Sequence, residues 1–167
     1  MEISISEAKD YATIIGIFVA LLTYVTNSYF QLRNKKIENM KRFLDAHDVL
    51  FEGNRYLVRN VKAMETGIYK RDYENSEMEL AFTRFLGDVE KIALLTSHRA
   101  VPKEAQIYML GWFALKIQPE IKGSERTNIF WELAIHYIDE LAKAASDYEK
   151  LDSKKRARYL RKRKLVH

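Results

Sequence analysis

The sequence predicts an all-α protein in which one N-terminal transmembrane helix continues into a compact bundle of about four to five helices. Three observations predict this fold. Residues 11–32 carry no charged side chain. Only two prolines and six glycines interrupt the 167 residues, as is typical of helical proteins. After residue 33, apolar residues recur at helical spacing, and no alternating stretch is long enough to predict a strand.

The uncharged run at residues 11–32 is the predicted membrane span. As a helix it would rise about 33 Å, enough to cross the hydrocarbon core of about 30 Å. The residues before it are mainly acidic, whereas a signal peptide begins with positive charge. A buried core helix is the alternative. Cations follow the run, so the positive-inside rule places the N-terminus outside and the rest of the chain in the cytoplasm.

Small and polar residues of this run fall on one side of the predicted helix. At about 100° per residue they share an arc of about 140°, and the large apolar residues occupy the rest. Small residues let helices approach closely in lipid, and polar groups there prefer a neighbouring helix or water. This side is therefore predicted to pack in a homo-oligomer or to line a pore, and a simple dimerisation face is the alternative. Its residues are Ala12, Thr13, Gly16, Ala20, Thr23, Thr26 and Asn27.

The first helix is predicted to begin near Ile5, because Ser4-Ile-Ser-Glu7 matches the capping-box pattern. No proline interrupts the chain before Pro102. The helix is therefore expected to continue beyond the membrane to about Phe51, with Gly53-Asn54 as its stop signal.

The next two helices are predicted on either side of a loop. Apolar periodicity indicates a helix over residues 55–65, and residues 66–75 read as a loop. A second capping-box pattern, Ser76-Glu-Met-Glu79, is expected to open a third helix that ends near Leu95.

A fourth helix is predicted to begin at Pro102 and to end before Pro119, since proline suits the first turn of a helix. A fifth is predicted to begin between Ser124 and Asn128 and to extend toward the C-terminus. The expected organisation is an N-terminal segment with the membrane helix at 1–33, a cytoplasmic helical domain at 34–150 and a basic tail at 151–167.

The positive charge of the chain is concentrated in that tail. The whole chain has a net charge of +5, whereas the tail alone contributes +7, so the preceding residues sum to −2. Such a tail is expected to contact anionic lipid or RNA, with a solvated, partly disordered end as the alternative. Its cations are Lys154, Lys155, Arg156, Arg158, Arg161, Lys162, Arg163 and Lys164.

Several common signatures of catalysis and metal binding are missing from the sequence. There is no cysteine, no glycine-rich phosphate loop, no Gly-x-Ser-x-Gly and no His-Glu-x-x-His. The four histidines are never three or four residues apart, so neither a metal site nor a cofactor is predicted. His136 lies between aromatic residues and is expected to be a hydrogen-bonded core residue.

One short pattern could carry chemistry. Arg42-Phe-Leu-Asp-Ala-His47 fits Arg-x4-His, and Arg161 to His167 fits Arg-x5-His. A histidine and an arginine can handle the proton and the phosphate charge of RNA cleavage. The alternative for Arg42 is a membrane-proximal cation, and for His47 a surface or packing residue. Residues five apart on one helix point about 140° away from each other.

The membrane helix, the helical domain, the Arg42–His47 pattern and the basic tail together resemble a family of membrane-associated HEPN-like accessory proteins. These are encoded beside the RNA-guided effector nuclease of type VI-B CRISPR systems. The resemblance implies a HEPN-like fold, location in the inner membrane of a bacterium, and an oligomeric pore that strengthens antiviral defence when the nuclease is triggered. The implied partner is that RNA-targeting nuclease or RNA. A membrane-anchored, non-catalytic adaptor and a membrane-tethered, metal-independent ribonuclease are the alternatives, in that order.

Overall fold

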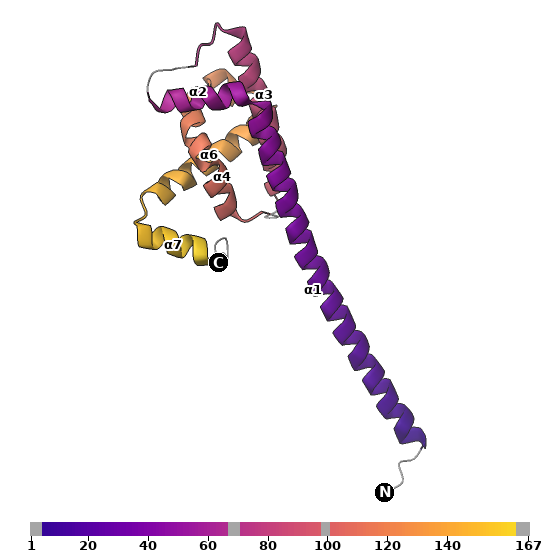
Figure 1. The fold of residues 1–167 in the computed structure, drawn as a ribbon. Helices are drawn as coiled ribbons and strands as arrows, with labels where there is room; N and C mark the ends of the chain where they lie inside the picture. Colours follow the sequence, from indigo (N-terminus) through magenta and orange to yellow (C-terminus); the bar gives the residue numbers. More distant parts are fainter. Residues whose placement is uncertain (1–4, 67–70, 98–100, 163–167) are drawn as a thin grey trace. The chain divides into compact units, whose positions relative to one another are not determined.

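The computed structural model describes residues 5–66, 71–97 and 101–162. All regular elements within these ranges are helical, and the all-α prediction is confirmed (Figure 1). In chain order they are α1 (Ile5–Gly53), α2 (Arg55–Glu65), α3 (Ser76–Thr96), α4 (Lys103–Ile117), the 3-10 helix η1 (Gln118–Glu120), α5 (Gly123–Arg126), α6 (Glu132–Glu149) and α7 (Ser153–Lys162).

The chain divides into two compact units, Met1–Glu38 and Asn39–His167. The described part of the first unit is the N-terminal portion of α1. The second unit is a helical bundle made from the rest of α1 and from α2 to α7. The prediction that the membrane helix continues into the bundle is confirmed, because α1 crosses the boundary between the units as one helix.

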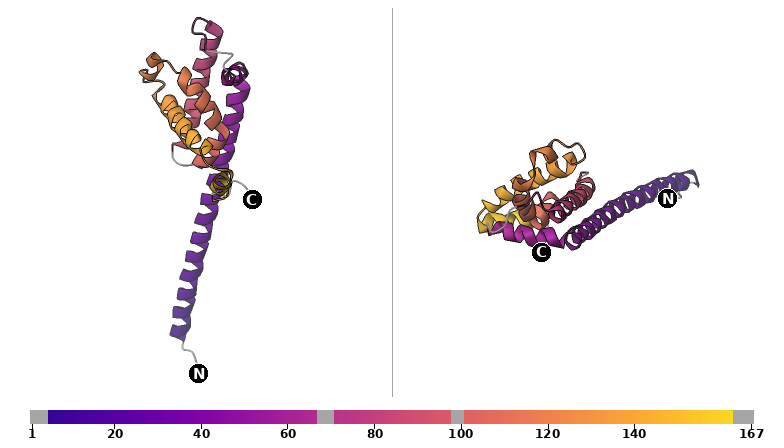
Figure 2. Two further views of the ribbon diagram at one scale, coloured as in Figure 1. Left: turned by 90° about the vertical axis from the view of Figure 1, so that its left-hand side faces the viewer. Right: turned by 90° about the horizontal axis from the view of Figure 1, so that it is seen from above.

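The core of the bundle forms where α6 packs against α4 and α3, while α2 packs against α3 and α4 (Figures 1 and 2). The buried residues of α6 recur every three or four positions, which places them on one side of the helix. The last part of α1 adds Phe43 and Leu50, which are at most 1% exposed. The larger buried side chains include Phe43, Leu50, Leu57, Val61, Phe82, Leu86, Ile92, Leu110, Ile117, Ile138 and Leu141.

The start of α3 differs from the predicted capping box. The N-cap is Asn75, whose Oδ1 accepts hydrogen bonds from the backbone N–H groups of Glu77 (3.1 Å) and Met78 (3.2 Å). Asparagine caps a helix as well as serine does, and the carboxylate of Glu79 is used elsewhere, by Arg71. The prediction that Ser76 and Glu79 cap the helix is therefore wrong by one residue, although the helix itself is confirmed.

The predicted fifth helix is wrong in its extent. The structure instead has the short α5, a turn over residues 127–131, and then α6. Ile129 and Phe130 lie in the turn and are 75% and 73% exposed. The side chain of Asn128 accepts a hydrogen bond from the backbone N–H of Phe130 (3.0 Å), which favours the turn over a continued helix.

The basic tail begins as a separate helix rather than as an extension of α6. The chain leaves helical geometry near Leu151, and the Asp152 carboxylate accepts a hydrogen bond from the backbone N–H of Lys155 (2.7 Å) at the start of α7. The helix continues to Lys162. Arg163, Lys164 and His167 lie outside the described residues.

Candidate functional site

The N-terminal unit presents its apolar side chains outward. Within the described residues, one helix is long and apolar enough to cross a membrane, and none of its apolar window is buried. A buried core helix, the alternative for this run, would instead have most of its apolar window covered. The exposed fractions run from 52% to 72% for Ile14, Ile15, Ile17, Phe18, Leu21, Leu22, Tyr24 and Val25.

The threonines of the small and polar side are hydrogen-bonded within their own helix. Each hydroxyl donates to the carbonyl oxygen four residues earlier: Thr13 to Lys9 (2.9 Å), Thr23 to Val19 (2.8 Å) and Thr26 to Leu22 (2.7 Å). A satisfied donor does not need water or a partner helix. The threonines therefore make this side of the helix narrow, but their hydroxyl groups do not need a hydrogen-bond partner on another helix.

Asn27 differs from the threonines. Its side chain is exposed and makes no hydrogen bond among the described residues. A carboxamide carries two donor hydrogens and an acceptor oxygen, which in hydrocarbon find partners most readily on a neighbouring helix. Among the residues named for the small and polar side, Asn27 is thus the polar side chain that has most to gain from association.

Gly16 also has no packing role within the chain. A Cβ built there would meet nothing within 4 Å. Gly16, Ala20, Thr23 and Asn27 follow one another at intervals of four, three and four residues, which is the spacing of a single helix seam. The small side chains and the carboxamide are therefore presented together, along one line of α1. The side chains of Ala12 and of the residues before it, except Lys9 and Tyr11, lie outside the described part of the structure.

The structure does not bring Arg42 and His47 together into a local site. Both lie on α1, where a separation of five residues turns their directions about 140° apart. The His47 ring packs on the Phe51 ring (4.3 Å between centroids), and its Nδ1 lies 3.2 Å from the Asp48 carboxylate. A catalytic role for Arg42 and His47 stays a prediction. The packing on Phe51 fits the alternative that His47 is a packing residue.

The expectation that His136 is a core residue is wrong. Its side chain is 72% exposed, and its Nε2 lies 3.4 Å from the Glu140 carboxylate. The buried side of α6 includes Ala134 and Ile138. His136 is two residues from each, or about 200° around the helix, so it faces away from the core.

A shallow apolar groove lies within the bundle unit, between the last part of α1 and α3. Its volume is about 540 Å³. Val49 and Leu94 are each 58% exposed, although both are aliphatic. Asp88 is held at the groove by Lys91 Nζ (2.9 Å) and by Asn54 Nδ2 (3.0 Å). The lining residues are Asp45, Ala46, Val49, Asp88, Lys91, Leu94 and Leu95.

A polar cluster of the bundle centres on Arg71, which no sequence pattern indicated. Its side chain is 1% exposed. Its guanidinium donates to both carboxylate oxygens of Glu79 (2.8 and 3.0 Å), to both of Glu125 (2.7 and 3.0 Å) and to the backbone oxygen of Glu120 (2.9 Å). All five N–H groups are thereby used. The carbon of the guanidinium lies 3.5 Å from the Phe82 ring centroid.

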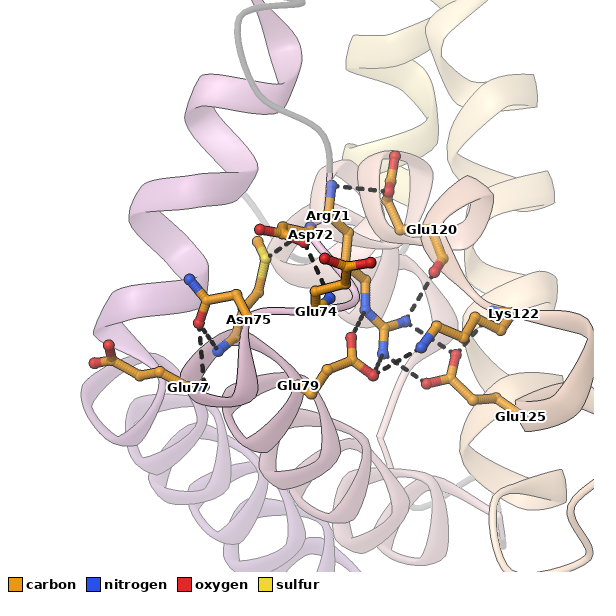
Figure 3. Close-up of polar contacts among 10 residues, drawn as sticks. Arg71, Asp72, Glu74, Asn75, Glu77, Glu79, Glu120, Lys122 and Glu125 are labelled. Carbon is orange, nitrogen blue, oxygen red and sulfur yellow. Dashed lines mark hydrogen bonds and ion pairs between the residues drawn. The ribbon is translucent and has the colours of Figure 1, made fainter.

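Lys122 completes this cluster, as Figure 3 shows. Its ammonium donates to Glu79 Oε2 (2.9 Å) and lies 4.0 Å from the centroid of the Tyr73 ring. Burial acts to raise the pKa of Glu79, but hydrogen bonds from Lys122 and Arg71 outweigh it and lower the pKa. Two cations thus neutralise two carboxylates.

The side chains of Arg71, Glu79, Lys122 and Glu125 form a structural cluster, called the clasp below. It joins the segment before α3 to α3 itself and to the region of η1 and α5 (Figure 3). Because no guanidinium N–H remains for a ligand, the arrangement is suited to holding these segments together rather than to binding phosphate or substrate. Its partners are eight and more than forty residues away in the sequence, so no local pattern could have predicted it.

No candidate metal centre is present among the described residues. They contain no group of three or more His, Asp or Glu side chains that could hold a metal ion. No protein-family model, curated protein or solved structure matches the chain. The exposed span of α1, with its small and polar side, is therefore the strongest candidate for a functional surface.

Proposed function

We propose that this chain is a single-pass membrane protein that forms a homo-oligomer through the small and polar side of its membrane helix. The observation that carries the proposal is that the span presents Gly16 and Asn27 on one side and that the chain itself uses neither. A glycine lets two helices approach closely, and a carboxamide hydrogen-bonds across the contact.

The proposed orientation places the N-terminus outside and the bundle in the cytoplasm of a bacterium, at its inner membrane. Five cations lie within the ten residues that follow the apolar run: Arg33, Lys35, Lys36, Lys41 and Arg42. Basic residues next to a span favour the cytoplasmic side.

The oligomer is further proposed to act as a pore-type accessory effector of bacterial antiviral CRISPR defence. It would perturb the inner membrane when an RNA-guided nuclease is triggered, and that nuclease or RNA would be its partner. Support for this finer proposal comes from the resemblance in architecture and from the sorting of residues on α1. A ring of such helices would turn the side with Thr13, Thr23 and Asn27 toward its centre.

Leakage from cells tests the pore directly. Ion or dye leakage would be compared between the wild type, Gly16→Leu and the control Val25→Leu. Val25 lies nine residues from Gly16, or about 180° around the helix, so its enlargement leaves the proposed contact intact. We expect leakage with the wild type and with Val25→Leu, and loss of leakage with Gly16→Leu. Equal leakage in all three, or none in any, contradicts a pore built on this side of the helix.

The groove between α1 and α3 favours a second candidate function, that of a membrane-anchored, non-catalytic adaptor. Val49 and Leu94 expose aliphatic surface of the kind that a helix or strand of another protein covers. An adaptor predicts no leakage and a stable, stoichiometric partner that is lost when Leu94 is changed to Asp. Leakage that survives Leu94→Asp but is abolished by Gly16→Leu supports the pore over the adaptor.

A further inference from the structure

The helix α7 concentrates positive charge on the surface of the bundle unit. Lys154, Lys155, Arg156 and Arg158 are all exposed. Asp152, just before the helix, is the one acidic residue in the sequence from position 151 onward, and its carboxylate lies 3.3 Å from Lys155 Nζ. Since the whole sequence before residue 151 sums to a net charge of −2, this concentration is specific to α7 and the residues after it.

The helix is seated on the bundle by an aromatic contact. The Tyr159 ring lies 5.3 Å from the Tyr148 ring of α6, and Tyr159 is partly buried against the core. Helical periodicity turns Lys154 and Arg158 about 140° and 100° away from Tyr159. The same packing therefore holds Lys154 and Arg158 on the outward side of α7, while Lys155 and Arg156, about 40° and 60° from Tyr159, lie exposed nearer to the packed side.

Within its unit, α7 lies close to the first residues of the α1 segment. Figure 1 and the left view of Figure 2 show α7 at the end of the bundle where the α1 segment of this unit begins. That segment begins at Asn39, seven residues or about 10 Å of helix beyond the last residue of the apolar run, Leu32. The exposed Lys41 and Arg42 lie there too.

We infer that α7 binds the phosphate-bearing headgroups of anionic phospholipids in the same bilayer that α1 crosses. Clusters of Lys and Arg next to a membrane helix bind acidic lipid surfaces, each cation contributing about five-fold in affinity. The inference rests on the proposed membrane location of α1 and is independent of oligomerisation and of the pore.

An RNA occupant fits α7 less well. Proteins that bind single-stranded RNA stack bases on exposed aromatic rings placed between their cations. The aromatic residue of α7, Tyr159, is instead packed on Tyr148. A uniform layer of phosphate is the better match for a short helix that offers charge without a stacking platform.

The experiment uses the full chain in lipid nanodiscs with a fluorophore on Ala157→Cys. The natural sequence has no cysteine, so labelling is specific, and Ala157 is exposed on α7. The discs contain phosphatidylcholine with or without phosphatidylglycerol, together with a lipid that carries a quencher at its headgroup. We expect strong quenching with phosphatidylglycerol, several-fold less without it, and loss of the difference at high salt.

Two sets of charge variants sharpen the experiment. Neutralising α7 with Lys154→Gln, Lys155→Gln, Arg156→Gln and Arg158→Gln should abolish the lipid-dependent quenching. The matched control removes the same charge from exposed positions on other helices, with Arg55→Gln, Arg59→Gln, Lys103→Gln and Lys143→Gln, and should leave the quenching intact.

Each of the following outcomes overturns the inference. Quenching that is equal in both lipids, or unchanged by the α7 variant, shows that anionic headgroups are not the ligand. A short RNA that binds in phosphatidylcholine discs and depends on the same cations assigns α7 to RNA instead. Failure of the chain to insert into any disc contradicts the membrane assignment as well, whereas insertion with an unquenched probe contradicts only the role of α7.

Discussion

Gly111 of α4 lies directly against Ala145 of α6, so that a Cβ at position 111 would be only 2.8 Å from the Cβ of Ala145. Real Cβ atoms do not approach so closely, and neither atom belongs to a flexible side chain that could turn away. The absence of a side chain at Gly111 thus sets the distance between two helices of the core.

Gly111→Ala is therefore expected to destabilise the bundle by about 1–3 kcal/mol, the usual cost of overpacking a core. The measurement is the midpoint of thermal unfolding of the detergent-solubilised chain by circular dichroism. Gly87→Ala is the control, because a Cβ there meets nothing within 4 Å and alanine favours a helix by up to about 1 kcal/mol. A midpoint that falls equally in both variants would contradict the close approach of α4 and α6.

Loss of Arg71 should damage the clasp between α3 and α5. In Arg71→Met, Glu79 and Glu125 remain close together without the cation between them, so a loss of about 3–5 kcal/mol is expected. The control is Lys150→Ala, whose ion pair with Asp147 is exposed and should contribute less than about 1 kcal/mol. Chemical denaturation of both variants measures the difference, and similar small losses would show that the clasp is dispensable.

The same cluster predicts a dependence of stability on pH. Because the folded-state pKa of Glu79 is lowered, its stabilising contribution is complete at neutral pH. That contribution is lost as the pH falls from about 4.3, the ordinary pKa of glutamate, through the lower folded value. Thermal midpoints across this range should fall less steeply in Glu79→Gln than in the wild type. The variant keeps some acid sensitivity, because the pKa of Asp139 is also lowered, by hydrogen bonds from Arg126 and Gln118 that outweigh its burial. An unchanged slope in Glu79→Gln would contradict this role.

Asn27 is expected to contribute to self-association within the membrane. Asn27→Leu should weaken the oligomer by about 0.6–2 kcal/mol, the range that spans folded membrane proteins and model peptides for polar contacts between membrane helices. Fluorescence energy transfer between labelled chains in lipid vesicles measures this. Moving the carboxamide to the opposite side, in the double variant Asn27→Leu with Val25→Asn, tests whether position matters. Full association of the double variant would show that any asparagine in the span suffices and that this side of α1 is not special.

The sequence predicted most of the helical fold because helical periodicity and caps are local signals. The bounds of α2 at Arg55–Glu65 agree with the prediction. The turn before α6 was missed because Ile129 and Phe130 extend the apolar pattern although both are exposed. The prediction that His136 is buried was wrong for a similar reason. Its aromatic neighbours in the sequence did not indicate which side of α6 faces the core.

The candidate site was predictable only in part. The sorting of small residues on α1 follows from sequence, and so does the isolation of charge in the tail. Whether the threonine hydroxyls were already satisfied required the structure, which shows each bonded to its own helix. Among the residues named for this side, Asn27 is then the polar side chain without a hydrogen bond to the described residues. The clasp of Arg71 depends on residues that only the folded chain brings together.

Cysteine cross-linking in native membranes tests the central claim most directly, because the chain contains no cysteine of its own. Single variants would be oxidised and resolved by non-reducing electrophoresis. Ala20→Cys and Thr23→Cys, on the side of Gly16, should give covalent dimers in the membrane fraction. Phe18→Cys and Val25→Cys, on the opposite side, should remain monomeric. Equal cross-linking on both sides, or recovery of the unmodified chain as a soluble monomer without detergent, would contradict a membrane helix that meets its copies through this seam.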